Sequence, residues 1–247
     1  MFLKWVSIII VCGFFLILGI TSRADVLSGE NFDVYYKASD KRLAQDVLNY
    51  ANSAKVMIEN SLGYSLQKIT INLERPPVDR YSRDYKAYIN KAYYDPIPLR
   101  RQAFPNKVIA HELIHVATYQ MLGEKKALEM PRWFFEGLSA YLSGYPLGIP
   151  IQKLVSNGEL LPLNKLRGDW GNPIGKLAQT GYSEGRLTVE YLVSKKEGIL
   201  QKILQMMKSK KSFSDAISTY YEISLQDFEK QAFDYLYHIG ENNIGKN

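Results

Sequence analysis

Residues 106–122 read NKVIAHELIHVATYQML, and this stretch decides how the chain is organised. From Val108 to Leu122 the pattern predicts a helix with apolar side chains on almost every face, and Asn106 is suited to cap its N-terminus. A helix that is apolar all round is buried, because none of its faces is suited to water. We therefore expect this helix at the centre of the protein.

Two of the three histidines of the chain lie in this helix, in the run His111-Glu112-Leu113-Ile114-His115. Residues four apart on a helix lie one above the other, so both imidazoles face the same point. Glu112 lies one residue, about a 100° turn, from His111 and flanks that point. Two neutral imidazoles beside a carboxylate are suited to hold a zinc ion and to take a proton from water. The run therefore predicts a zinc site that needs a third ligand.

Three downstream glutamates are candidates for that ligand, Glu124, Glu129 and Glu136. The first two fall in a polar connection after the helix. Glu136 stands among large apolar side chains in residues 130–141, MPRWFFEGLSAY, where an unpaired buried carboxylate would be costly. A metal ion is one partner that removes this cost. We expect Gly137 to let this second helix come close to the histidine helix.

The two segments together resemble the gluzincin clan of zinc metallopeptidases, and more closely the small peptidase-MA-like families. In these, HExxH is followed after about twenty residues by a W-x-x-E-G-L-x-x-Y helix. The resemblance implies that His111, His115 and Glu136 bind one zinc ion per chain. It also implies that Glu112 is the general base that activates water for attack on a carbonyl.

The resemblance extends to Tyr182-Ser183-Glu184-Gly185, which is similar to the tyrosine-initiated helix that follows the zinc site in that group. It implies that the Tyr182 hydroxyl donates a hydrogen bond to the oxyanion formed when water adds to a carbonyl. Gly185 and Arg186 depart from the group, which has a small polar residue and an aromatic there. A core or hinge tyrosine is the alternative role for Tyr182.

The remaining patterns predict an α+β fold. Alternation predicts strands at residues 31–36, 68–74 and 88–94, and helical spacing from Ser39 to Leu62 ends at Gly63. Residues 143–175 are rich in glycine and proline and predict loops. Further helices are predicted at 183–195, 199–208, 213–221 and 225–239, before a frayed tail from 240. Strands followed by helices indicate a small N-terminal sheet with a helix, the zinc helix in the middle and a helical C-terminal part.

The first 24 residues predict export. Lys4 precedes an apolar run over residues 5–20, and residues 22–24 form a small-x-small site. The length of the run leaves open a cleaved signal peptide or an anchor that contacts the membrane through residues 5–20. In both cases residues 25–247 are expected outside the cytoplasm. We expect them to form a single catalytic domain, with a sheet-containing part at 25–122 and a helical part at 123–247.

Composition narrows the class of protein. The only cysteine is Cys12, so the exported part has no disulfide and must be stabilised by packing and metal, which fits a bacterial cell-surface protein. The net charge of +6 is a mild basic excess that suits an anionic envelope or membrane surface. The densest basic run, residues 208–211, is short and has no interleaved aromatic residue, so no nucleic-acid partner is predicted.

The predicted function is therefore zinc-dependent hydrolysis of peptide bonds in a peptide or protein substrate. Endopeptidase action is the default, because the G-x-M-E-N motif of large aminopeptidases is absent. The alternative is a non-catalytic zinc-bearing surface domain that binds or scaffolds. Glu112 argues against this alternative, because a structural zinc site prefers four protein ligands and needs no base. The sequence leaves the substrate and the oligomeric state open.

Overall fold

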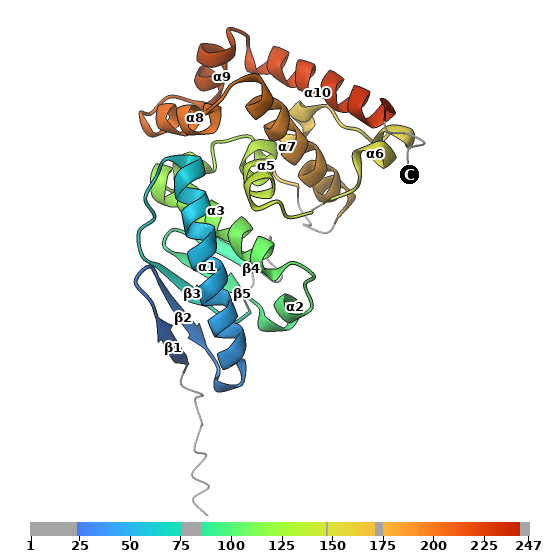
Figure 1. The fold of residues 1–247 in the computed structure, drawn as a ribbon. Helices are drawn as coiled ribbons and strands as arrows, with labels where there is room; N and C mark the ends of the chain where they lie inside the picture. Colours follow the sequence, from blue (N-terminus) through green and yellow to red (C-terminus); the bar gives the residue numbers. More distant parts are fainter. Residues whose placement is uncertain (1–23, 76–84, 147, 171–174, 243–247) are drawn as a thin grey trace, which may run out of the picture.

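The computed structural model describes residues 24–75, 85–146, 148–170 and 175–242 (Figure 1). The predicted export segment lies outside these ranges, apart from Ala24. Within them, none of the helices combines the length and the apolar character that crossing a membrane requires.

The N-terminal part is built on a five-stranded mixed sheet in the order β1-β2-β3-β5-β4. The outer pairs, β1 with β2 and β4 with β5, are antiparallel, whereas β2, β3 and β5 run parallel. Parallel neighbours need a crossover connection, which helix α1 supplies between β2 and β3 (Figure 1). The strands are β1 (Asp25–Ser28), β2 (Phe32–Tyr36), β3 (Ile69–Asn72), β4 (Tyr85–Tyr88) and β5 (Lys91–Tyr94).

Two of the predicted strands are confirmed as β2 and β3, and the third is corrected. Residues 88–94 do not form one strand, because the chain reverses between β4 and β5. Asn90 in this turn has a φ of 59°, in the left-handed region that asparagine tolerates better than most residues. Strand β1 was not predicted, because its side chains are mostly exposed and do not alternate.

Helix α1 (Lys41–Leu62) follows a short 3₁₀ turn, η1 (Ala38–Asp40), and fits the predicted helix. Its buried positions recur every three or four residues and form a stripe that packs against α3 and β2. The helix ends at Gly63 as predicted. Gly63 has a φ of 62° and its N–H donates to the Glu59 carbonyl, which satisfies an otherwise free end of the helix.

Helix α3 (Pro105–Leu122) is the predicted buried helix. It packs against α1, α5, β4 and β5, and most of its residues from Val108 onward are buried. The Tyr94 hydroxyl donates to the Ile109 carbonyl at 3.0 Å and ties the sheet to this helix. Asn106 does not cap it. The helix begins at Pro105, with Phe104 in the N-cap position, because proline is favoured in a first turn, where no N–H is needed.

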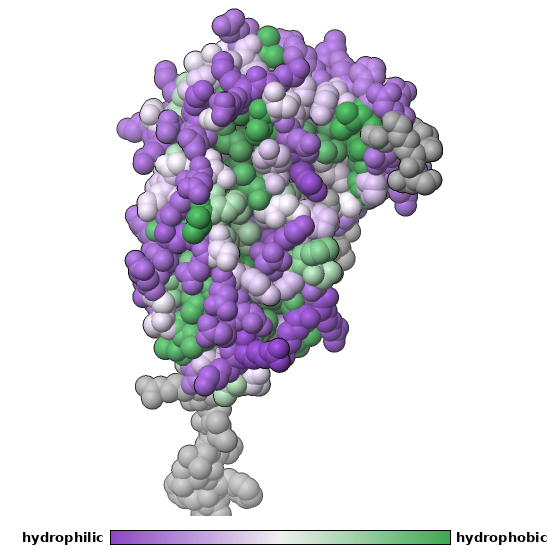
Figure 2. Space-filling model, viewed as in Figure 1, coloured by the Kyte–Doolittle hydropathy of each residue, from purple (hydrophilic) through white to green (hydrophobic). Residues whose placement is uncertain are grey.

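The rest of the described chain is helical, which confirms the α+β class. α5 lies along α7, and α10 packs against α6, α7 and α9 (Figure 1). The surface on the side shown in Figure 2 is mostly hydrophilic, with smaller hydrophobic areas between polar ones. The elements are α2 (Pro96–Arg100), α4 (Glu124–Ala127), α5 (Arg132–Ser143), α6 (Ile151–Ser156), η2 (Leu163–Leu166), α7 (Lys176–Lys195), α8 (Ile199–Lys208), α9 (Phe213–Tyr221) and α10 (Leu225–Asn242).

Three boundaries in this part differ from prediction. The region predicted as loops, residues 143–175, contains the short helices α6 and η2. Helix α7 starts at Lys176, seven residues before the predicted start at position 183. α10 runs through Gly240, which was predicted to lie in a frayed tail. Gly181 of α7 lies against the Trp170 ring, and Gly240 lies against the Val155 side chain. These contacts favour helix at glycines whose intrinsic propensity is low.

Candidate metal centre

The structure brings His111 and His115 of α3 together with Glu136 of α5. The two Nε2 atoms lie 3.2 Å apart, and Oε2 of Glu136 lies 3.3 Å from Nε2 of His111 and 3.2 Å from Nε2 of His115. The three residues are 5%, 6% and 4% exposed. A buried group that could hold a metal ion therefore lies where the helix under the sheet meets the helical part of the chain.

Helix α5, which carries Glu136, packs closely against α7 through two glycines. A Cβ built on Gly137 would lie 2.3 Å from the carbonyl oxygen of Gly185, and one on Gly185 would lie 2.5 Å from the carbonyl oxygen of Trp133. The two glycines thus let α5 and α7 approach backbone to backbone. This corrects the expectation that Gly137 serves the contact with the histidine helix. The same contact explains why position 185 is a glycine and not the small polar residue of the resembled group, because a Cβ there would clash with the backbone of α5.

The three donor atoms fit a zinc ion. Tetrahedral zinc with nitrogen and oxygen ligands at about 2.0–2.1 Å places neighbouring ligand atoms about 3.3–3.4 Å apart. The observed separations of 3.2–3.3 Å agree with this value. Lone pairs that converge in a buried space also need a cation or a proton between them. Two imidazoles and one carboxylate are a donor set that zinc uses in catalytic sites.

Arg132, one helical turn before Glu136, engages the other carboxylate oxygen. Its Nη2 lies 2.5 Å from Oε1, which leaves Oε2 turned to the histidines. Burial alone would raise the pKa of Glu136, but the charge of Arg132, together with the interactions with His115 and His111, holds this pKa well below its usual value. The guanidinium also lies 5.9 Å from the ring centroids of both Phe135 and Trp170. Arg132 was not predicted, because a helix-surface arginine carries no signal of its own.

Glu112 is half-buried beside this group. Burial raises its pKa, the neighbouring imidazoles of His115 and His111 oppose the rise, and the charge of Glu136 adds to it. A carboxyl group with a raised pKa takes and returns protons more effectively near neutral pH. The residue therefore has the environment that a general base needs.

Two tyrosines lie near these carboxylates. Tyr182 sits inside α7 and not at the start of a helix as predicted, and its ring meets Trp170 edge-on at 5.3 Å between centroids. Burial, and then the charge of Glu136, raise the pKa of Tyr182. Tyr145 was missed by the sequence reasoning. Its ring centroid lies 6.2 Å from that of His111, and burial and the charge of Glu112 raise its pKa.

Tyr145 follows α5 in a connection whose sequence carries no motif. Its hydroxyl donates to Oε1 of Gln102 at 3.1 Å. Gln102 comes from the segment between α2 and α3, so this hydrogen bond joins the connections before α3 and after α5. These two connections are far apart in the sequence, and the tertiary fold brings them together beside His111.

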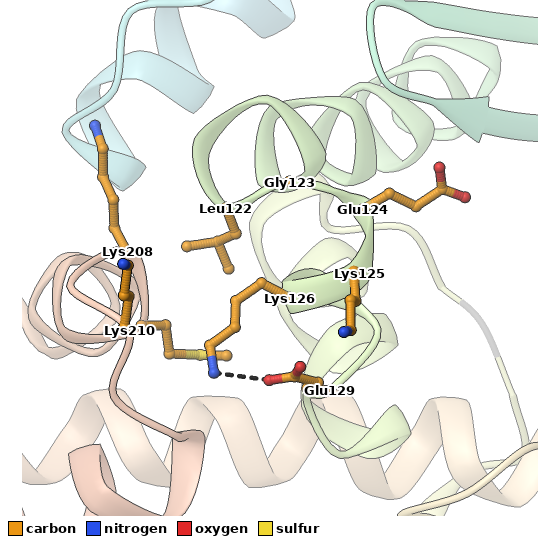
Figure 3. Close-up of a pocket in the computed structure, with 9 residues that line it drawn as sticks. Leu122, Gly123, Glu124, Lys125, Lys126, Glu129, Lys208 and Lys210 are labelled. Carbon is orange, nitrogen blue, oxygen red and sulfur yellow. Dashed lines mark hydrogen bonds and ion pairs between the residues drawn. The ribbon is translucent and has the colours of Figure 1, made fainter.

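The other ligand candidates lie elsewhere. Glu124 and Glu129 line an open hollow of about 680 Å³ beyond the C-terminal end of α3, together with lysines of α4 and α8 (Figure 3). Glu129 pairs there with Lys126 at 2.7 Å. His238, the third histidine, is exposed near the end of α10 and lies 3.7 Å from Glu241. Neither glutamate belongs to the buried group, and nor does His238.

No protein-family model matches the chain, and comparison with the curated proteins finds no match. The buried triad does fit the geometry of an HExxH helix with a downstream glutamate. The functional argument therefore rests on these residues and on their distances.

Proposed function

We propose that the chain is a zinc-dependent peptidase of the gluzincin type, acting through a single catalytic domain of residues 25–247. The observation that carries this proposal is the set of three buried donor atoms with separations of 3.2–3.3 Å. Catalytic zinc sites use three protein ligands and keep a position open, whereas structural sites close with four. The described residues supply three candidate ligands to this group, which is the number that a catalytic site uses.

His111, His115 and Glu136 would hold the ion, which supplies Lewis acidity toward a carbonyl and toward water. Glu112 accepts the proton of the attacking water and returns it to the leaving amine. Its position next to His111 in the chain and its raised pKa support this role. Tyr182 is the proposed donor to the oxyanion, supported by its place near Glu136.

Metal content tests the ligand assignment. We expect one zinc ion per chain, and strongly weakened binding after His111→Ala, His115→Ala or Glu136→Ala, because each removes one of three donors. His238→Ala is the matched control, since this histidine is exposed and outside the group, and it should keep full zinc. Elemental analysis showing full zinc in the Glu136 variant would remove this residue from the site.

Hydrolysis separates the peptidase from a zinc-bearing binding or scaffold domain. Glu112→Gln should keep zinc and fold but lose nearly all cleavage of a mixed-peptide library, because the amide cannot accept the proton. Glu129→Gln, an exposed glutamate in the distant hollow, should cleave as the parent does. A zinc-loaded parent that cleaves no peptide in the library would favour the binding domain.

The proposal places residues 25–247 outside the cytoplasm, on the basis of Lys4 and the apolar run over residues 5–20. A reporter fused after Asn247 that works only outside the cytoplasm should be active. Activity of a reporter that works only inside would contradict export.

A further inference from the structure

The two histidines of the buried group differ in what holds their rings. Nδ1 of His115 lies 3.1 Å from Oγ of Ser139, and its ring stacks on Phe135 with centroids 4.3 Å apart at an interplanar angle of 23°. Ser139 is completely buried. Phe135 and Ser139 belong to α5, the helix that also carries Glu136. One helix thus provides a candidate ligand and both supports of a second one.

The direction of the hydrogen bond between Ser139 and His115 follows from a second contact. Oγ of Ser139 also lies 3.4 Å from the carbonyl oxygen of Phe135, one turn earlier in α5. A carbonyl only accepts, so the serine proton is directed to it, as serine commonly does within helices. Oγ then accepts a hydrogen bond from the Nδ1–H of His115. With the proton on Nδ1, Nε2 keeps its lone pair.

His111 has no such support within the described residues. Its Nδ1 is buried without a hydrogen-bond partner there, and its nearest aromatic neighbours, His115 and Tyr145, meet it edge-on. Histidines that bind metal almost always donate their second ring N–H, which fixes the tautomer and the orientation of the ring. Only His115 meets this condition through a side chain of the described protein.

We propose that Ser139 is a positioning residue that holds His115 in the tautomer protonated on Nδ1, with Nε2 turned to the metal position. The proposal rests on the proposed zinc function, because it assigns Ser139 a role only toward a bound cation. Loss of such a support typically weakens metal binding by about 10-fold to 100-fold. Ser139→Ala should therefore weaken zinc binding by about this factor.

The test uses the full chain and two measurements that do not depend on catalysis. Zinc affinity is measured by competition with a fluorescent chelator for the parent, Ser139→Ala and Thr118→Val. Thr118 is the matched control, because its buried hydroxyl donates to the Ile114 carbonyl at 2.8 Å. Its removal should leave zinc affinity within the error of the parent. Nitrogen-15 NMR of the unmodified, zinc-loaded chain reports which ring nitrogen of His115 carries the proton.

We expect the proton on Nδ1 in the unmodified chain and weaker zinc binding in Ser139→Ala alone. A parent that binds zinc while Ser139→Ala binds it equally well would overturn the role of Ser139 and leave the zinc function intact. A proton on Nε2 of His115 would overturn it too, whether or not the alanine variant folds. A parent that binds no zinc would remove both proposals together.

Discussion

Glu184 gives a prediction whose size follows from its surroundings. It lies in α7 and is completely buried, with Oε1 accepting the Leu161 N–H at 2.8 Å and Oε2 without a partner in the described residues. Burial raises its pKa from 4.5 to about 8, against the opposing effect of the Leu161 hydrogen bond. The folded protein therefore holds this carboxyl protonated at neutral pH, whereas the unfolded chain ionises it.

The sign of the effect on stability is fixed by this shift. Because the folded pKa is the higher one, the stabilising contribution is complete below pH 4.5 and is lost as the pH rises through 8. Each pH unit between these values costs about 1.4 kcal/mol. From pH 5 to pH 9 the free energy of unfolding should fall by about 4 kcal/mol on account of this group.

Glu184→Gln removes the ionisation and keeps an acceptor for the Leu161 N–H. The free energy of unfolding of the parent and of the variant is measured in urea at pH 5, 7 and 9. In the difference between the two proteins at each pH, the contributions of all other titratable groups cancel. The free energy of unfolding of the variant minus that of the parent should therefore rise by about 4 kcal/mol from pH 5 to pH 9. Glu190→Gln, an exposed glutamate on the same helix, controls for the substitution itself. Parallel curves for the parent and Glu184→Gln would refute the buried, neutral carboxyl.

Two further predictions concern the site and its support. Gly137→Ala puts a methyl group 2.3 Å from the Gly185 carbonyl oxygen, so α5 and α7 must separate. We expect a loss of about 1–3 kcal/mol in urea unfolding and weaker zinc binding, whereas Gly168→Ala, in open space, should match the parent. Tyr182→Phe should lower kcat by about 100-fold with little change in KM or zinc content. Tyr145→Phe should cost less, because its hydroxyl already donates to another side chain, and the reverse order would make Tyr145 the oxyanion donor.

The sequence alone was enough to place the candidate ligands. His111 and His115 are one helical turn apart, so any helix through them brings their rings to one point. Glu136 stood out because a carboxylate among large apolar residues needs a partner when it is buried. The α+β class and the central helix followed from periodicity, which reports which faces are apolar. These inferences depend on contacts within one element or on burial, and both leave a pattern in the sequence.

The tertiary structure decided what those patterns do not contain. Periodicity shows that a face is buried but not what it packs against, so the contact of Gly137 with α7 could not be read from the chain. The same holds for Ser139, whose partner His115 lies 24 residues earlier on another helix. The early start of α7 includes Gly181, whose low helix propensity is offset by its packing against the Trp170 ring. Which residues of two helices contact each other depends on how closely the backbones approach and how the side chains interdigitate. Both are properties of the packed pair of helices, so the pattern of one helix does not show them.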